Sequence, residues 1–223
     1  MGNKVFNFSG PLSDLQQWQG QLAWHIIYER NPALPYSKEQ MIRRSRKVPT
    51  AAYESFIKGI QTRDVKLRET FLRRALQEYQ NSGEAGHFAQ AIYELGLLLY
   101  RQADFAEAAK LLKELNKDDP TYSESLFYLG LAAYKAGDSA EASSAFEKLI
   151  ELTPILEAMN NAGASLLAKG ENEKALNFLR RALANSPNDV IYRFNYGYAQ
   201  WRVQNYTEAA QHLSVVVKAN PRD

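Results

Sequence analysis

The sequence contains no cysteine and only three histidines and three methionines among its 223 residues. The absence of cysteine excludes disulfide bonds, thiol catalysis and cysteine-ligated zinc, but it leaves the redox compartment open. Long apolar runs are also missing: mean hydropathy is −0.44, and no segment approaches the about 20 apolar residues of a membrane-spanning helix, so we expect no membrane insertion. The formal net charge of +2 gives no global signal for nucleic acid or an anionic surface. Aromatic residues, in contrast, are plentiful, with 13 Tyr, 10 Phe and 3 Trp.

Motifs that carry chemistry are missing as well. His25, His87 and His212 lie in separate segments, and none has a second ligand at the helical spacing that a metal site requires. The sequence has no phosphate-binding loop, no dinucleotide glycine fingerprint and no nucleophile elbow. The carboxylate pair Asp118-Asp119 adjoins a turn, where solvation explains it better than catalysis. We therefore expect no enzyme activity, no cofactor and no metal, and we interpret His25 as a packing residue.

An internal repeat dominates the carboxyl-terminal half. Four glycines are separated by 34, 33 and 34 residues, and each is followed by an alanine 12 residues later and a proline after 12 more. The glycines are Gly96, Gly130, Gly163 and Gly197; the alanines are Ala108, Ala142, Ala175 and Ala209; the prolines are Pro120, Pro154, Pro187 and Pro221. A fixed period of this size indicates a stacked array of repeats.

The glycines lie inside apolar helical patterns, where each costs about 1 kcal/mol relative to alanine. A cost accepted four times indicates that a second helix approaches closely, and we expect the alanines to supply the other side of that contact. The prolines end each second helix. Short polar turns, such as Gly137-Asp138 and Gly170-Glu171, separate the two helices of each repeat.

This pattern closely resembles the tetratricopeptide repeat family. Residues 89–122 (repeat 1) carry Leu95-Gly96, Tyr100, Phe105 and Glu107-Ala108 where that family has its small and bulky positions. Repeats 2, 3 and 4 cover 123–155, 156–189 and 190–223. The resemblance implies an all-α fold in which helix pairs stack into a right-handed superhelical solenoid with a concave inner face. The tryptophan that the family has early in each first helix is replaced here by Ile92, Leu126, Met159 and Arg193.

The amino-terminal third is also predicted to be helical. Thr50 to Gln61 and Asp64 to Tyr79 form a helix pair, so we interpret 50–88 as a degenerate repeat at the start of the array. Residues 1–49 form a helical extension, with an amphipathic helix from Ser13, its expected cap, to Arg30. Its expected apolar face is formed by Leu15, Trp18, Leu22, Ala23 and Ile26. Ser37 and Gln40 form a predicted capping box.

Residues 5–60 are similar to a junction in bacterial multidomain signalling proteins, where an α/β domain that resembles the amino-terminal domain of TolB precedes tetratricopeptide repeats. The similarity includes a strand-like Val5-Phe6-Asn7-Phe8 and, further on, Pro49-Thr50-Ala51-Ala52-Tyr53-Glu54. It implies that the sequence is a fragment of a larger protein. The compartment stays open between the cytoplasm, which we favour, and the periplasm.

Basic residues gather in the amino-terminal part. Residues 1–88 contain 13 Lys and Arg against 8 Asp and Glu, a net charge of +5. The cluster comprises Arg43, Arg44, Arg46, Lys47, Arg63, Lys66, Arg68, Arg73 and Arg74. It indicates either an anionic partner such as nucleic acid or a solvated helix surface. We favour the solvated surface, because no aromatic residues alternate with the charges as they do in nucleic-acid sites.

The inner stripe is our name for the residues at −6, −3, +1, +4 and +5 from the glycine of each repeat, which share one helix face. In repeats 1 and 2 these are Gln90, Tyr93, Leu97, Tyr100, Arg101, Glu124, Phe127, Leu131, Tyr134 and Lys135. In repeats 3 and 4 they are Glu157, Asn160, Ala164, Leu167, Ala168, Ile191, Phe194, Tyr198, Trp201 and Arg202. Tyr93 and Leu97 stand where the carboxylate-clamping variant of the family has lysine and asparagine, so we do not expect that clamp.

The stripe predicts a non-enzymatic protein–protein interaction module that binds a peptide or helix of a partner in an aromatic-lined groove. The expected partner-binding residues are Tyr93, Tyr100, Arg101, Phe127, Tyr134, Lys135, Asn160, Phe194, Tyr198, Trp201 and Arg202. Alternatively, the first helix folds back and fills the groove. Burial of Tyr134, Tyr198 and Trp201 by residues 1–48 would distinguish that arrangement.

An architectural role is the second hypothesis: the segment oligomerises, or presents another domain of a larger bacterial protein. The sequence ends without the extra polar helix that commonly covers the last apolar face of such arrays. Leu213, Val216 and Val217 are then expected to be exposed and to promote self-association. A third possibility, binding of nucleic acid by the basic cluster, is the least favoured.

Overall fold

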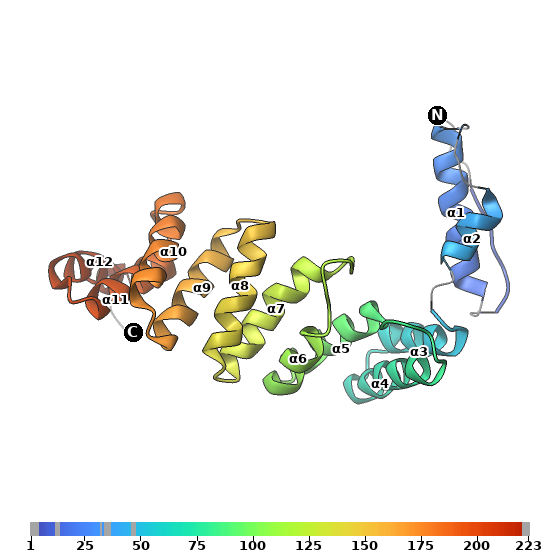
Figure 1. The fold of residues 1–223 in the computed structure, drawn as a ribbon, viewed down its shortest axis with the longest axis horizontal. Coiled ribbons are helices and arrows are strands. Elements are labelled where there is room, and N and C mark those ends of the chain that lie inside the picture. Colours follow the sequence, from blue (N-terminus) through green and yellow to red (C-terminus); the bar gives the residue numbers. More distant parts are fainter. Residues whose placement is uncertain (1–4, 12–13, 32, 34–36, 46–47, 220–223) are drawn as a thin grey trace. The chain divides into compact units, whose positions relative to one another are not determined.

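A computed structural model describes residues 5–11, 14–31, 33, 37–45 and 48–219, the side chains of 43–45 excepted. These residues form twelve α-helices and no β-strand (Figure 1). The helices are α1 (Leu15–Arg30), α2 (Lys38–Ser45), α3 (Thr50–Gln61), α4 (Val65–Asn81), α5 (Ala89–Arg101), α6 (Phe105–Leu112), α7 (Tyr122–Lys135), α8 (Ser139–Leu152), α9 (Leu156–Lys169), α10 (Asn172–Asn185), α11 (Val190–Arg202) and α12 (Tyr206–Ala219). The all-α prediction is confirmed, and the strand-like interpretation of Val5–Phe8 is wrong.

The chain divides into two compact units, Met1–Glu94 and Leu95–Asp223, with the boundary inside α5. In the first unit, α1 packs on α2 and α3 packs on α4. The helix pair predicted for 50–88 is present as α3 and α4, and the Asp64 carboxylate caps α4 by accepting a 2.8 Å hydrogen bond from the Leu67 amide. The predicted capping box is present as well, since the Ser37 amide donates to Gln40 Oε1 at 2.8 Å and the Gln40 amide donates to Ser37 Oγ at 3.3 Å.

Helix α1 differs from its prediction. It begins at Leu15 with Asp14 at the cap position, and Ser13 lies outside the described residues. Instead of a buried apolar face, the helix buries Gln16 and Gly20, while Leu22 and Ile26 are exposed. The reason is that Trp24, Ile27 and Tyr28 distribute apolar side chains around the whole helix, so that no single face is favoured for burial. The side-chain amide of Gln16 instead donates to the Val48 carbonyl at 2.9 Å.

One carboxylate of the first unit has a perturbed acidity. Partial burial alone would raise the pKa of Glu78, but hydrogen bonds from Ser55 (2.6 Å) and Arg74 (2.8 Å), with the positive charges of Arg74 and Lys58, outweigh burial and hold the pKa below its ordinary value. The contact joins α3 to α4, so the ionised carboxylate stabilises this helix pair.

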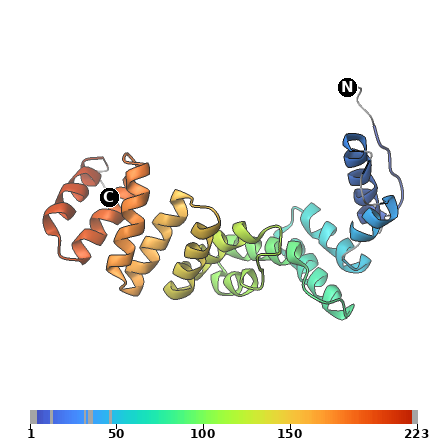
Figure 2. The ribbon, with the colours of Figure 1, turned by 45° about the horizontal axis from the view of Figure 1, so that its top comes forward.

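In the second unit, each helix from α6 to α12 packs against the next along the chain (Figures 1 and 2). Helices α5–α6, α7–α8, α9–α10 and α11–α12 fall within the residue ranges expected for repeats 1 to 4, except that α7 begins one residue earlier, at Tyr122. At the position of the family's tryptophan, Ile92, Leu126 and Met159 are buried. Arg193 is half-buried, and its guanidinium donates a hydrogen bond to the Pro187 carbonyl.

The contact at each repeat glycine differs in one respect from the prediction. The alanines are buried as expected, but the side chain that lies over each glycine comes from one turn later in the second helix. A methyl group added at Gly96 would lie 2.7 Å from Leu112, and one added at Gly130 would lie 2.6 Å from the ring of Phe146. The close approach is thus a small residue against a large one, 16 positions apart in the sequence.

The turns inside the repeats share one backbone geometry. One or two residues after each first helix, the backbone adopts a positive φ: 63° at Ala103, 87° at Gly137, 87° at Gly170 and 64° at Gln204. In every case the next amide donates 2.9 Å back to a helix carbonyl five residues earlier, for example Asp138 to Ala133. This is the Schellman ending that glycine favours, and two of the four repeats adopt it without glycine.

Ion pairs connect the second helices of successive repeats. Lys113, at the end of α6, pairs with Glu141 of α8, and Lys174 of α10 lies 2.7 Å from Glu147 of α8. The hydrogen bond that the Lys113 ammonium donates to Glu141, together with the negative charge of Glu141, raises the pKa of Lys113. Among the described helices, none combines the length and apolar character required to cross a bilayer.

Candidate functional site

Three of the five exposed aromatic side chains that the structure describes in the second unit lie on α11. Phe194, Tyr198 and Trp201 lie at i, i+4 and i+7 and so share one helix face; their exposed fractions are 48%, 37% and 52%. The rings are stacked, with Phe194 6.4 Å from Tyr198 and Tyr198 5.7 Å from Trp201 between centroids. Because each ring is supported by its neighbour, this face presents a pre-ordered apolar surface. Of the inner stripe of repeat 4, these three rings and Ile191 are exposed, and Arg202 is half-buried.

A cation lies on the same face. The Arg202 guanidinium carbon is 5.9 Å from the centroid of the Tyr198 ring, and its Nη1 donates to the Tyr198 hydroxyl at 3.4 Å. The π-face of the ring attracts the guanidinium and limits its motion. Arg202 therefore carries an oriented positive charge beside the aromatic surface.

A hollow of about 230 Å³ lies next to the stacked rings. Its lining comes from α7, α9 and α11, one helix from each of repeats 2, 3 and 4, and consists of Tyr134, Ala164, Leu167, Ala168, Phe194, Asn195, Tyr198 and Arg202. Seven of these eight residues belong to the inner stripe, and Tyr134 is 43% exposed.

Asn195 was not predicted, although it lines the hollow. Its side-chain amide donates 2.8 Å to Asn160 Oδ1, and Asn160 in turn donates 3.3 Å to Asn161 Oδ1. Asn160 is buried, with 5% of its surface exposed. It was predicted to contact a partner, but the structure uses its amide to hold α9 to α11. The only signal in the sequence was a polar residue at −2 from the glycine in repeats 3 and 4.

The aromatic residues of repeats 1 and 2 are less accessible. Tyr100 is half-buried and packs edge-on against Phe105 and Tyr128, with centroids 5.5 and 5.7 Å away. Phe127 is half-buried and lies 6.1 Å from Phe146.

The remaining predicted site residues fall into two groups. Arg101 and Lys135 are exposed on the second unit. Tyr93 is half-buried and belongs to the first unit, so it is not part of the surface described here.

The three rings named for the alternative arrangement all belong to the second unit, whereas the first helix belongs to the first unit. Tyr134, Tyr198 and Trp201 retain about two-fifths to one-half of their accessible surface.

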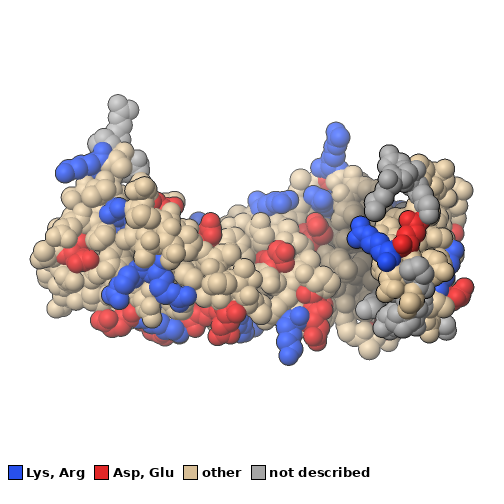
Figure 3. All heavy atoms as spheres, turned by 90° about the horizontal axis from the view of Figure 1, so that it is seen from above, with Lys and Arg blue, Asp and Glu red and all other residues tan. Residues whose placement is uncertain are grey.

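The basic cluster divides in two. The side chains of Arg43, Arg44, Arg46 and Lys47 lie outside the described residues. Arg73 and Arg74 are engaged, at 2.8 Å from Glu69 and Glu78 respectively. On the face drawn in Figure 3, positive and negative side chains of the described residues are interspersed, which fits a solvated helix surface.

His25, half-buried, stacks on Phe6 with 5.0 Å between ring centroids, as expected of a packing histidine. Within the described ranges, no three His, Asp or Glu residues gather closely enough to hold a metal ion.

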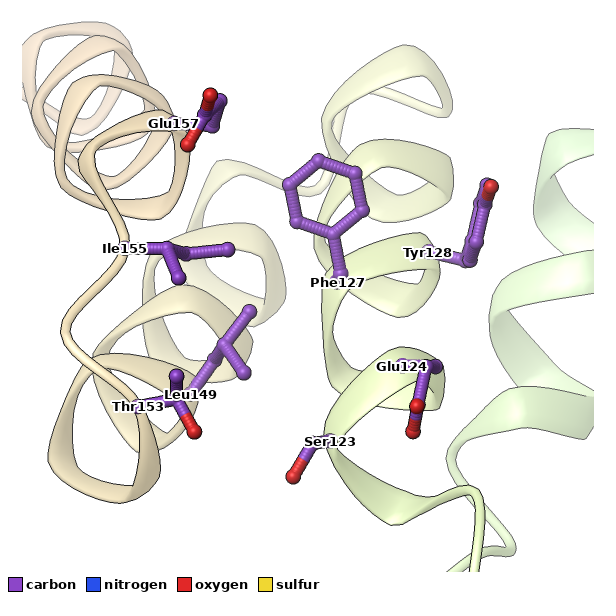
Figure 4. A pocket seen from close by; sticks show the side chains of 8 residues that line it. All are labelled: Ser123, Glu124, Phe127, Tyr128, Leu149, Thr153, Ile155 and Glu157. Carbon is purple, nitrogen blue, oxygen red and sulfur yellow. The ribbon is translucent and has the colours of Figure 1, made fainter.

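A second and larger pocket, of about 390 Å³, was missed by the sequence reasoning. It lies between α7, the end of α8 and the start of α9, and Figure 4 shows its eight lining side chains. Three of them, Glu124, Phe127 and Glu157, are inner-stripe residues. The others are Ser123 and Tyr128 of α7, Leu149 of α8, and Thr153 and Ile155 of the connection between repeats 2 and 3.

Comparisons with known proteins identify the repeat. A family model described as tetratricopeptide repeat matches residues 93–155 and 160–223, more than half of the chain. No curated protein sequence matches. Among solved structures, one titled as a crystal structure of MamA protein superposes with a TM-score of 0.64 and 18% identity, over 75% of this chain and 91% of that one. A MamA fragment from Desulfovibrio magneticus RS-1 gives a TM-score of 0.62 and 16% identity, over 77% and 95% of the two chains. At this level of identity the similarity shows the fold.

Proposed function

Because the chain belongs to the tetratricopeptide repeat family, a family of protein-interaction modules, we propose that residues 95–223 bind a segment of a partner protein in the hollow between α7, α9 and α11. The observation that carries the proposal is the combination of that hollow with the exposed, stacked rings of Phe194, Tyr198 and Trp201. Large rings that are already ordered lose little conformational entropy on binding, which is why such residues form binding hot spots.

The chemistry of the walls indicates the class of ligand. The lining includes three rings, Tyr134, Phe194 and Tyr198, with Leu167 and two alanines, which suits an apolar side chain. Arg202 also lines the hollow and would hold a carboxylate of the partner. The proposed ligand is therefore a peptide or helix with an apolar anchor next to an acidic residue, and the module itself is non-enzymatic.

The test starts from a random 12-residue peptide library selected on the full chain. The best peptide is then titrated by fluorescence anisotropy against wild type, the double variant Tyr134→Ala/Trp201→Ala, and Tyr206→Ala. Tyr206 is the matched control, because it is an exposed tyrosine on α12 that does not line the hollow.

We expect the double variant to bind at least about tenfold more weakly, the size of a hot-spot loss, with far-UV circular dichroism unchanged. Tyr206→Ala should bind like wild type. Equal affinity of the double variant, or an equal loss in Tyr206→Ala, would contradict the assignment, and so would a library from which no peptide is enriched.

A second candidate function, self-association, is favoured by one observation on α12. Tyr206, Leu213 and Val217 share one face of this helix, and 59% of Tyr206 and 62% of Val217 is exposed. Leu213 is only half-buried although it lies over Gly197. Light scattering over a concentration series should show a rising mass that Val217→Lys abolishes. A constant monomer mass would exclude this route.

A further inference from the structure

The pocket between α7, α8 and α9 has apolar side chains from all three elements that line it. Figure 4 shows Phe127 of α7, Leu149 of α8 and Ile155 at the start of α9 converging on one space. Its volume of about 390 Å³ lies within the range of small-ligand sites, roughly 300–1,000 Å³. It shares no lining residue with the hollow beside the stacked rings.

The rim of this pocket carries one sign of charge. Glu124 and Glu157 lie on opposite sides of the apolar space and both are exposed (Figure 4). The eight residues that line the pocket include no lysine, arginine or histidine. Neither carboxylate forms an ion pair with any residue that the structure describes, in contrast to Glu141 and Glu147 of the intervening helix α8. The two negative charges are therefore left uncompensated beside an apolar cavity.

A purely structural role accounts for only part of this arrangement. Each glutamate stands in the first turn of its helix, where a negative charge is favourable. A favourable charge at a helix N-terminus does not require the two glutamates to line the same cavity. It also does not require Phe127 to stay half-buried. The uncovered apolar walls and the paired charges are both explained by a ligand that is apolar at its tip and positive near its base.

We propose that this pocket is a second binding site, which receives an apolar side chain of the partner protein that adjoins a lysine or arginine. The apolar side chain lies against Phe127, Leu149 and Ile155, and the adjacent cation lies between Glu124 and Glu157. Because the ligand is a segment of the partner, the inference rests on the proposed function. The test below nevertheless addresses a different set of residues.

The experiment uses the isotopically labelled full chain and three N-acetylated dipeptide amides, Lys-Phe, Gln-Phe and Glu-Phe, titrated by amide chemical-shift mapping at low salt. All three share the apolar anchor and differ only in the charge beside it. The variant Glu124→Gln/Glu157→Gln removes both carboxylates with little change in shape. Glu173→Gln, an exposed glutamate of α10 outside the pocket, is the matched control.

We expect the shifts to centre on the amides of α7 and the start of α9, and the Lys-Phe peptide to bind about three- to tenfold more tightly than Glu-Phe, as two exposed ion pairs allow. The preference should disappear at 1 M salt, where the screening length is about 3 Å. In Glu124→Gln/Glu157→Gln the preference should disappear while Gln-Phe affinity stays unchanged, and Glu173→Gln should behave like wild type.

Equal affinity of Lys-Phe and Glu-Phe in wild type would overturn the proposal, as would shifts confined to α11 or no binding of any dipeptide at millimolar concentration. Each of these results leaves the test of the α11 surface standing, because that test measures other residues with another peptide. Conversely, loss of the α11 surface as a binding site would not alter the charge preference measured here.

Discussion

The contact between Gly130 and Phe146 gives the sharpest test of how the repeats are held together. A methyl group at Gly130 would lie 2.6–2.7 Å from three ring carbons of Phe146. Favourable carbon–carbon contacts lie at about 3.5–4.0 Å, so the ring would have to retreat by roughly 1 Å. Phe146 is only 1% exposed, and its ring is flanked by that of Phe127. It therefore has no free space into which to move.

Two opposing effects set the magnitude for Gly130→Ala. Overpacking of a buried site costs about 1–3 kcal/mol, and replacing a helical glycine with alanine returns about 1 kcal/mol. We expect a net loss of about 1 kcal/mol in the free energy of unfolding. At Gly197 the nearest atoms are 3.0–3.1 Å away and belong to Leu213 and His212, which are half-buried. There the neighbour can shift, so Gly197→Ala should be neutral or stabilising by up to about 1 kcal/mol.

Urea unfolding followed by far-UV circular dichroism measures both variants, with an unchanged m-value as the check that the compactness of the unfolded state is the same. Phe146→Ala provides the second half of a double-mutant cycle. On its own it should cost about 3–5 kcal/mol, but adding Gly130→Ala to it should restore about 1 kcal/mol, because the ring that clashed is gone. The reasoning is refuted if Gly130→Ala is as stable as Gly197→Ala, or if the second substitution destabilises Phe146→Ala further.

Three further expectations follow from local geometry. Gln204→Gly should raise the free energy of unfolding by about 1 kcal/mol, because Gln204 holds a φ of 64° that costs a non-glycine residue about that much; an unchanged thermal midpoint would contradict it. Asn195→Ala should lower stability by about 1–3 kcal/mol, since it leaves the buried amide of Asn160 without its 2.8 Å partner; urea unfolding is the measurement, and a neutral result would refute it. The lowered pKa of Glu78 means that its stabilisation is complete above its ordinary value of 4.5 and is lost as the pH falls through the lowered pKa. Ser55→Ala should move the NMR-measured pKa of Glu78 upward, and no movement would show that this hydrogen bond does not matter.

The array could be predicted from the sequence because its physical requirements repeat. Three residues recur at one spacing: a glycine where two helices touch, an alanine in the second helix and a proline after that helix. The recurrence excludes chance and indicates where the helices begin and end. Gly96 and Gly130 each mark the contact correctly. The identity of the opposing side chain did not follow, because the residue 16 positions later is leucine in some repeats and phenylalanine in another, such as Phe146. Because the residue type at this position varies between repeats, the sequence shows no recurring residue that would mark the contact.

Helix α1 shows the converse case. Its apolar residues match a helical stripe through Leu15, Trp18 and Leu22, but other apolar residues match other stripes equally well. Which face is buried is then decided by a polar contact, from the Gln16 side chain to the Val48 backbone, between residues 32 positions apart. Helical periodicity reports local geometry, and it contains no information about a hydrogen bond formed across that distance in the sequence.

The split between exposed and packed aromatic residues is explained by side-chain size in one repeat. In repeats 1 and 2 the inner-stripe ring Tyr100 meets Tyr128 of the next repeat and becomes half-buried. Repeat 3 has alanines at the +1 and +5 stripe positions, Ala164 and Ala168, where repeats 1 and 2 have leucine and a basic residue, and its +4 residue is Leu167 instead of a tyrosine. The hollow is the volume that those missing side chains would have filled, and it is walled by rings that would otherwise have been core. The capacity of this chain to receive a side chain from outside therefore depends less on how many aromatic residues it has than on the small residues that separate them.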